Sequence, residues 1–261
     1  MRRLIVVTTV LLCLAGCEGR GTNPSDAPAA KKSEGLVTVS LTFDDTVANQ
    51  WDGVGIMHRY DMLGTFYVNS PRIDDGIHLT KAQLDEMQTR GHEIGGHTLN
   101  HCKCIENEPD IDIVRREICD DHDALVKKGY TVTSFAYPRG EAGGHMTPVA
   151  KECYASAREV GGIAGGSPNT AESIPPCDVF AIRTPRSVNV GDSLEDLQGY
   201  IIAARESGGG WVPLIFHHVS DDERQDLRVT PELFDKFLQW LSAERAAGRV
   251  VIKTVSGTLK N

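Results

Sequence analysis

The sequence predicts an α/β fold in which a parallel β-sheet closes into a (β/α) barrel, with helices outside it and a single domain. From residue 36 onward, short β-branched segments alternate with longer amphipathic segments, an order typical of parallel sheets. About 226 residues follow residue 35, enough for one domain with a large core. Neither GxGxxG nor a P-loop motif follows the first predicted strand, which favours a barrel over a nucleotide-binding open sheet.

The strands are predicted from short runs rich in β-branched and aromatic residues. Apolar and polar residues alternate in the first run, LVTVSLTFD, so we expect its side chains to point to the two faces of the sheet in turn. The predicted strands cover residues 36–44, 64–69, 92–96, 131–137, 211–217 and 250–255.

Three helices are predicted between these strands, over residues 80–91, 109–129 and 230–248. The first begins with Thr80 and Gln83, which have the spacing of a capping box. The third begins with Thr230 as N-cap and Pro231 at the first helical position. The second is indicated by apolar residues near one helical stripe, namely Ile111, Val114, Ile118, Leu125 and Val126.

The first 35 residues have a different composition from the rest. A charged start precedes an apolar run that ends in LAGC at Cys17, which resembles a bacterial lipoprotein signal. We therefore expect a signal peptide over residues 1–16, lipidation of Cys17, and export to the cell envelope. The alternative is an ordinary cleaved signal with an incidental cysteine. Residues 17–35 are rich in Gly, Pro, Ser and Ala, so we expect a flexible tether that anchors the domain over residues 36–261 to a membrane.

The charge of the chain argues against a nucleic acid partner, and the expected export of the chain predicts the state of its cysteines. The formal net charge is −9, and nucleic acid would demand the opposite sign, so we expect no nucleic acid partner. Export implies an oxidising compartment, so we expect at least one disulfide among the five cysteines beyond Cys17. The sequence does not select the pairing among Cys102, Cys104, Cys119, Cys153 and Cys177.

Polar clusters follow four of the predicted strands. In barrels of parallel strands the carboxyl ends of the strands meet at one face, where chemistry is found, so we expect these clusters to converge. The clusters are Asp44 with Asp45, His97 with His101, the turn FAYPRG, and His217 with His218.

Two kinds of metal site are compatible with the cluster HTLNHCKC. His97 and His101 would share one face of a helix, and with Asp45 they would form a His₂Asp set with open positions, as in catalytic zinc sites. The alternative is a closed structural site made by His97, His101, Cys102 and Cys104. That alternative leaves LTFDD and FHH without a role, so we favour the catalytic site and expect Cys102 and Cys104 to cross-link the loop.

The motifs LTFDD, HTLNH, FAYPRG and LIFHH, in this order, resemble the polysaccharide deacetylases of carbohydrate esterase family four, the NodB-type domain. The resemblance extends over residues 36–255. It implies a distorted (β/α) barrel and metal-dependent removal of acetyl groups from N-acetylglucosamine polymers or acetylated xylan. It also implies Asp44 as general base, His217 as general acid, and Asp45, His97 and His101 as metal ligands.

Three positions depart from the family pattern. Thr46 stands where a glycine usually follows the two aspartates, and Ala136 stands where an arginine normally orients the base. We expect Arg183 or Arg186 to replace that arginine, without a choice between them. Arg139 stands in place of a tyrosine, and we expect only its backbone N–H to act, by stabilising an oxyanion.

The expected function is therefore metal-dependent deacetylation of a polysaccharide or oligosaccharide. The ligand set accepts Zn²⁺, our first expectation, as well as Co²⁺, Ni²⁺ or Fe²⁺. The first alternative is a glycan-binding protein on the same fold that has lost activity through the changes in the third motif. A second alternative is a zinc-stabilised interaction module. In the last motif we expect the acid to be His217, with His218 dispensable.

Overall fold

The computed structural model describes residues 34–165 and 169–260, apart from the side chains of Lys103 and Cys104. The predicted signal peptide, Cys17 and all but the last two residues of the predicted tether lie outside the described residues. Within the described part of the chain, no helix combines the length and apolar character needed to cross a membrane.

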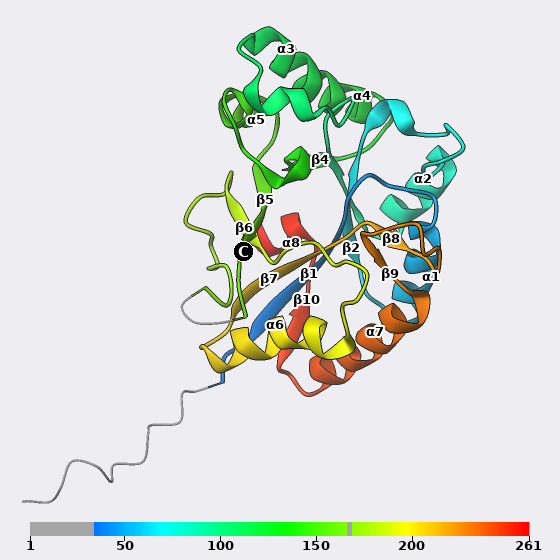
Figure 1. Ribbon diagram of the computed structural model, residues 1–261, viewed down its shortest axis with the longest axis vertical. Coiled ribbons are helices and arrows are strands. Elements are labelled where there is room, and N and C mark those ends of the chain that lie inside the picture. Colours follow the sequence, from blue (N-terminus) through cyan, green and yellow to red (C-terminus); the bar gives the residue numbers. More distant parts are fainter. Residues whose placement is uncertain (1–33, 166–168, 261) are drawn as a thin grey trace, which may run out of the picture. The chain divides into compact units, whose positions relative to one another are not determined.

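Strands and helices alternate along most of the chain (Figure 1). The strands are β1 (Val37–Phe43), β2 (Gly64–Val68), β3 (Glu93–Gly96), β4 (Val132–Ala136), β5 (Ser156–Gly162), β6 (Ile182–Thr184), β7 (Gly210–Phe216), β8 (His218–Val219), β9 (Arg228–Val229) and β10 (Val250–Ile252). The α-helices are α1 (Gln50–Arg59), α2 (Lys81–Thr89), α3 (Ile111–Arg115), α4 (Asp121–Lys127), α5 (Met146–Cys153), α6 (Leu194–Glu206), α7 (Pro231–Ala246) and α8 (Val255–Leu259). Shorter helical turns are η1 (Ser70–Arg72), η2 (Lys103–Asn107), η3 (Arg116–Asp120) and η4 (Pro138–Gly140).

Seven parallel strands form a nearly closed barrel in the order β7-β1-β2-β3-β4-β5-β6. On one edge β1 pairs along its whole length with β7, while β10 and β2 pair with its first and second halves. Between β6 and β7 the described residues form no continuous ladder. An isolated bridge from Glu172 to Trp211 borders this gap. The predicted barrel is therefore confirmed.

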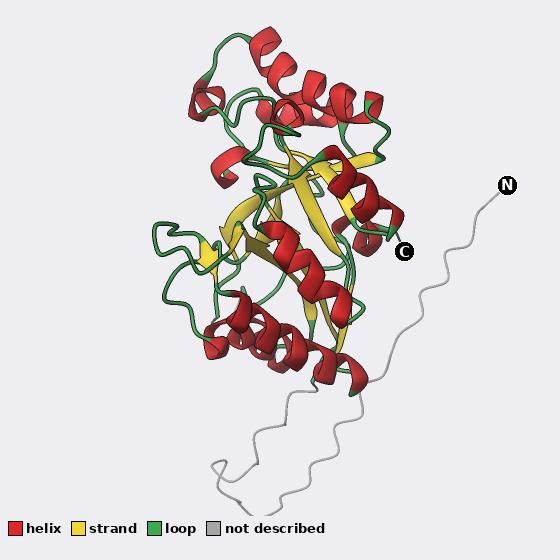
Figure 2. Cartoon of the chain, turned by 90° about the vertical axis from the view of Figure 1, so that its right-hand side faces the viewer, coloured by secondary structure: helices red, strands yellow, loops and turns green. Residues whose placement is uncertain are grey.

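The core explains why β1 is central. All seven of its residues are buried, because one face of the strand packs inside the barrel and the other against helices. Phe43 stacks on Phe66 of β2 and on Phe216 of β7, which fixes the three strand ends that lead into the polar clusters. Figure 2 shows the helices outside the strands on more than one side.

The helix ends follow the predicted caps, whereas the middle helix differs from its prediction. Thr80 and Gln83 form the capping box of α2, and Thr230 caps α7. The segment 109–129 is not one regular helix: η3 is a π-helical turn between α3 and α4. Ile111 and Val126 are exposed rather than buried, because Ile111 begins α3 at the edge of the domain and Val126 follows the buried Leu125 on the next face.

A disulfide joins Cys119 in η3 to Cys153 at the end of α5, so the prediction of at least one disulfide is confirmed. Cys102 is also disulfide-bonded, and Cys177 is free and exposed. The side chain of Cys104 lies outside the described residues, so the cross-link expected between Cys102 and Cys104 stays a prediction.

Candidate active site

Two carboxylates occupy the end of β1. Asp45 and Thr46 both have left-handed backbone conformations, with φ of 66° and 50°. Glycine adopts this conformation most readily, so Thr46, which stands where a glycine was expected, adopts it at the cost of some strain. The Gln50 amide donates to the carbonyls of Asp44 and His217, at 2.6 and 2.7 Å, and so ties the ends of β1 and β7 together.

His97 and His101 meet through a loop and not through a helix, so the helical interpretation of their spacing is wrong. Thr98 and His101 have φ of 69° and 51°, and the two left-handed residues fold the chain back after β3. The centroids of the two imidazole rings are 4.8 Å apart. The His101 N–H donates to the Thr98 hydroxyl, which closes the turn.

Two buried polar side chains that the sequence did not single out hold this loop. Asn69, after β2, donates its amide hydrogens to the carbonyls of His97 and Thr98, at 2.6 and 2.7 Å. Asp121, at the start of α4, accepts from the backbone N–H groups of Ser70 and His97. Asn69 lies in the predicted strand run GTFYVN, so an amide at a strand end was its sequence signal. Asp121 is one of several acidic residues in its segment and had none.

Asp45, His97 and His101 form a cluster whose donor atoms fit a divalent metal ion. Oδ1 of Asp45 lies 3.7 Å from Nε2 of His97 and 3.5 Å from Nε2 of His101. A tetrahedral ion with bonds of 2.0–2.1 Å separates its ligands by about 3.3 Å, so these distances need little adjustment. Oδ1 of Asp45 is buried and has no hydrogen-bond partner among the described residues, as expected for a ligand atom.

The protonation of His97 and Asp45 also suits a metal ion. Nδ1 of His97 is 2.8 Å from the carbonyl of Ala136 and must donate to it, which leaves Nε2 with a free lone pair. Burial lowers the pKa of His97, and the carboxylates of Asp44 and Asp45 oppose this shift only in part. Burial alone would raise the pKa of Asp45, but the surrounding charges, His97 and His101 first, lower it. Neutral imidazole and ionised carboxylate are the forms that bind metal.

Arg158 contacts the expected base, and the expectation that Arg183 or Arg186 would do so is wrong. Arg158 lies in β5 and donates from Nη2 to Oδ1 of Asp44, with both side chains buried. Arg183 instead pairs with Glu172, and Arg186 pairs with Asp192, because β6 and the loop after it turn these side chains away from Asp44.

The arginine that contacts Asp44 therefore lies in β5, which was not among the predicted strands. Its guanidinium carbon lies 4.6 Å from the centroid of the Tyr67 ring, so the cation packs on an aromatic face as well as pairing with the carboxylate. The run SAREVGG that contains Arg158 is short and rich in small residues, and nothing in it distinguishes Arg158 from Arg183 or Arg186.

The polar clusters share one cavity of about 300 Å³ at the carboxyl ends of the strands. Nε2 of His217 lies 3.9 Å from Oδ2 of Asp44, whereas His218 contacts Asn49 and does not line the cavity. Burial lowers the pKa of His217, and the two aspartates oppose this shift. The lining residues are Asp44, Asp45, His101, Arg139, Val160, Ser187, His217 and Leu227.

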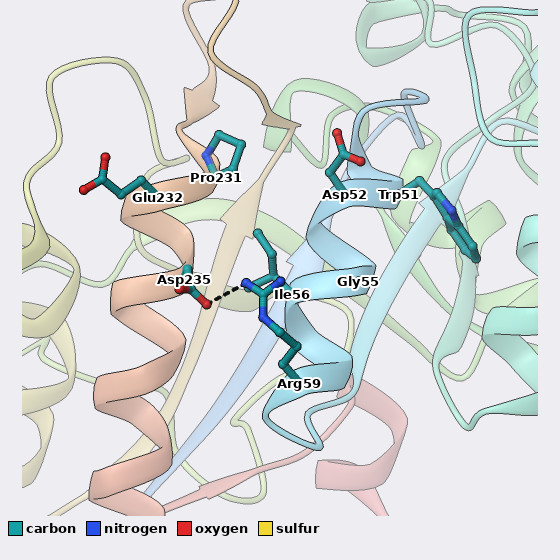
Figure 3. Close-up of a pocket in the computed structure, with 8 residues that line it drawn as sticks. All are labelled: Trp51, Asp52, Gly55, Ile56, Arg59, Pro231, Glu232 and Asp235. Carbon is teal, nitrogen blue, oxygen red and sulfur yellow. Dashed lines mark hydrogen bonds and ion pairs between the residues drawn. The ribbon is translucent and has the colours of Figure 1, made fainter.

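A second hollow lies between α1 and α7 and has a different character (Figure 3). Its volume is about 600 Å³, and Arg59 and Asp235 form an ion pair across it at 2.8 Å. Its carboxylates stand on exposed helix surfaces, and none of the predicted catalytic or metal-binding residues lines it. Size alone therefore does not identify the active site.

The closed structural site made by His97, His101, Cys102 and Cys104 is excluded. Cys102 is disulfide-bonded, and a disulfide sulfur cannot act as a thiolate ligand. The carboxylate of Asp45 lies within reach of both histidines, so it takes the third place beside them.

Comparison with known proteins agrees with this geometry. Residues 31–157 match the family model for polysaccharide deacetylase. No curated protein matches the chain in sequence.

Solved structures share the fold at low sequence identity. A family 4 acetyl xylan esterase from Clostridium thermocellum, in complex with a cobalt ion, is 21% identical with a TM-score of 0.58, covering 85% of this chain and 89% of that one. The Xyl-CE4 domain of a xylanase from the hindgut metagenome of Trinervitermes trinervoides is 15% identical with a TM-score of 0.57, covering 86% and 90%. The peptidoglycan deacetylase PdaC from Bacillus subtilis is 16% identical with a TM-score of 0.53, covering 85% and 90%.

Proposed function

We propose that this chain is a polysaccharide deacetylase, a metal-dependent hydrolase that removes acetyl groups from a glycan at a bacterial cell envelope. The observation that carries the proposal is that Asp44, His217 and the cluster of Asp45, His97 and His101 lie together at one cavity at the carboxyl ends of the strands. A protein that only bound glycans would have no need for a buried carboxylate, Asp44, that lies 4.0 Å from the metal ligand His97 and 3.9 Å from His217.

Asp45, His97 and His101 are the residues that would hold the ion, for which we propose Zn²⁺ first. When bound, a divalent ion would polarise a carbonyl and lower the pKa of bound water toward about 7. Co²⁺, Ni²⁺ and Fe²⁺ suit the same donors, and supply decides among them as much as affinity does.

The side chains around the ligands then divide the proton transfers between them. Asp44 takes a proton from the water that attacks the acetyl carbonyl, and Arg158 holds the Asp44 carboxylate toward the cavity. The backbone N–H of Arg139 stabilises the charge on the carbonyl oxygen. His217 gives a proton to the sugar nitrogen as the C–N bond breaks, and acetate and a free amine leave. An acetyl ester would follow the same course with an oxygen as leaving atom.

Acetate release tests the proposal. The metal-loaded protein should release acetate from at least one of chitin oligomers, peptidoglycan and acetylxylan, and Asp44→Asn should abolish release while metal content stays the same. Binding of these glycans without release from any of them would favour a glycan-binding protein. Neither binding nor release, with one tightly held ion, would favour a zinc-stabilised interaction module.

We further propose that Cys17 is lipidated and anchors the domain to the membrane after export. The LAGC sequence and the Gly-, Pro- and Ser-rich residues that follow it support this proposal. Metabolic labelling with a fatty acid should mark the wild-type protein and not Cys17→Ala, and unlabelled wild-type protein in the culture medium would contradict it.

A further inference from the structure

Arg139 is a charged residue at the cavity that the proposed reaction does not use through its side chain. It lines the cavity and is exposed, and its side chain makes no hydrogen bond or ion pair with another described residue. The other arginines near the site have carboxylate partners, namely Asp45 for Arg72, Asp44 for Arg158, Glu172 for Arg183 and Asp192 for Arg186.

The backbone at Arg139 is strained and firmly held. Its φ is 62°, a left-handed conformation that a side chain larger than glycine rarely adopts. The residues on both sides, Pro138 and Gly140, are buried, and the Gly140 N–H donates to the carbonyl of Tyr137 at 2.8 Å. A Cβ at Gly140 would come within 2.2 Å of Val160, so the turn packs tightly on β5. Strain of this kind persists where the surrounding structure enforces it, and it points to a use for the residue.

The charges around the cavity leave Arg139 without a counterpart in the protein. Asp44 is neutralised by Arg158, and Asp45 belongs to the metal-ligand set. With a divalent ion bound, the site carries a positive charge even though the chain as a whole is at −9. An anion on the substrate would complete this balance, and a guanidinium binds a carboxylate through two parallel hydrogen bonds.

The rest of the lining indicates what carries that anion. Val160 and Leu227 give the cavity apolar surface, and Leu227 is 38% exposed. Sugar rings have apolar faces that can pack on such side chains, so a ring and a carboxylate can be bound together. Resting on the proposed function, we propose that the Arg139 guanidinium binds a carboxylate of the glycan, and that the preferred substrate is an acidic acetylated polysaccharide rather than a neutral one.

The test compares acidic oligosaccharides with neutral copies of themselves. Two N-acetylglucosamine tetrasaccharides serve as substrates, one oxidised to a carboxylate at C6 and one bearing a carboxyethyl ether at O3, and each is paired with its primary amide. In the metal-loaded wild type, kcat/KM for at least one acid should exceed that for its amide by about 10- to 100-fold, the range expected for a charged hydrogen-bonded pair. The two acids distinguish a uronate from a carboxyl ether.

Arg139→Gln should bring this acid-to-amide ratio close to one, because glutamine keeps the backbone N–H and removes the charge. Arg139→Lys should keep part of the ratio. Arg224→Gln is the matched control, since Arg224 is exposed, pairs with Asp222 and does not line the cavity, and it should keep the full ratio. A ratio near one in the wild type for both acids, or an unchanged ratio in Arg139→Gln, would overturn the proposal.

Binding separates this proposal from the proposed catalysis. Calorimetry with the deacetylated acidic tetrasaccharide should show an affinity that falls with added salt and falls further in Arg139→Gln. If the wild type released no acetate from any substrate but kept this Arg139-dependent binding, the catalytic proposal would fail and the carboxylate contact would stand. If the wild type released acetate but showed no Arg139-dependent binding, the catalytic proposal would stand and the carboxylate contact would fail.

Discussion

Replacing Arg158 with methionine should destabilise the fold and lower turnover strongly without removing the metal. Arg158 and Asp44 form an ion pair whose side chains are 0% and 4% exposed. Methionine fills much of the same space but leaves the Asp44 carboxylate buried without its counter-charge. None of the three proposed metal ligands is changed, so metal content should stay at the wild-type level.

The expected loss of stability follows from the burial of the Arg158–Asp44 ion pair. Removing one partner of a buried ion pair costs about 3–5 kcal/mol, because the remaining charge stays out of water. Loss of the contact with the Tyr67 ring contributes up to about 2 kcal/mol of the effect. Turnover should fall by at least about 100-fold, the effect of a catalytic group displaced by about 1 Å.

A double-mutant cycle measures the pair directly. Urea unfolding of the metal-loaded proteins gives the free energy of unfolding of wild type, Arg158→Met, Asp44→Asn and the double variant. The double variant removes both charges, so its loss of free energy of unfolding should be smaller than the sum of the losses in the two single variants by at least about 2 kcal/mol. Additive losses would show that the two residues do not interact, and would refute Arg158 as the residue that orients the base.

Arg186→Met is the matched control for this cycle. Arg186 also pairs with an aspartate, Asp192, but the Arg186 side chain is 51% exposed and Asp192 also accepts a hydrogen bond from the Asn189 N–H, so removing Arg186 should lower the free energy of unfolding by less than removing Arg158 does. Turnover should remain near the wild-type value. A strong loss of turnover in Arg186→Met would restore the base-orienting role first expected of Arg183 or Arg186.

Three further predictions follow from the site and from the opposite end of the barrel. Asp45→Ala and His101→Ala should each lose metal after dialysis, measured by atomic spectroscopy, and full occupancy in either would exclude it as a ligand. His217→Ala should lower turnover strongly on an N-acetylated sugar and less on an activated aryl acetate, whose leaving group needs little protonation, whereas His218→Ala should be mild on both; the reverse order would move the acid to His218. His92, buried against Gly64 and His58, has its pKa lowered to about 4, chiefly by burial. Because the neutral ring is buried in the fold, the contribution of His92 to the free energy of unfolding is complete above pH 6.5 and is lost as the pH falls toward 4, by about 3 kcal/mol in total. His92→Asn should therefore flatten the pH dependence of the free energy of urea unfolding between pH 6.5 and 4. The same pH dependence in the wild type and in His92→Asn would refute the lowered pKa.

Features that depend on neighbours in the chain could be read from the sequence. The caps at Thr80 and Thr230 act on backbone N–H groups three residues away, so their motifs predict helix starts correctly. The pattern of β1 and its terminal aspartates is equally local. Because parallel strands end at one face, the motifs after β1, β3, β4 and β7 could also be assigned to one site.

Features that depend on contacts between distant segments were decided by the tertiary structure alone. Arg158 is 114 residues from Asp44, and no local pattern distinguishes it from Arg183 or Arg186; the register of β5 in the barrel makes the difference. His97 and His101 meet because Asn69 and Asp121 hold a left-handed loop, not because their spacing is helical. Burial sets the pKa of His92 in the same way, since desolvation depends on which segments cover the ring and not on its sequence neighbours.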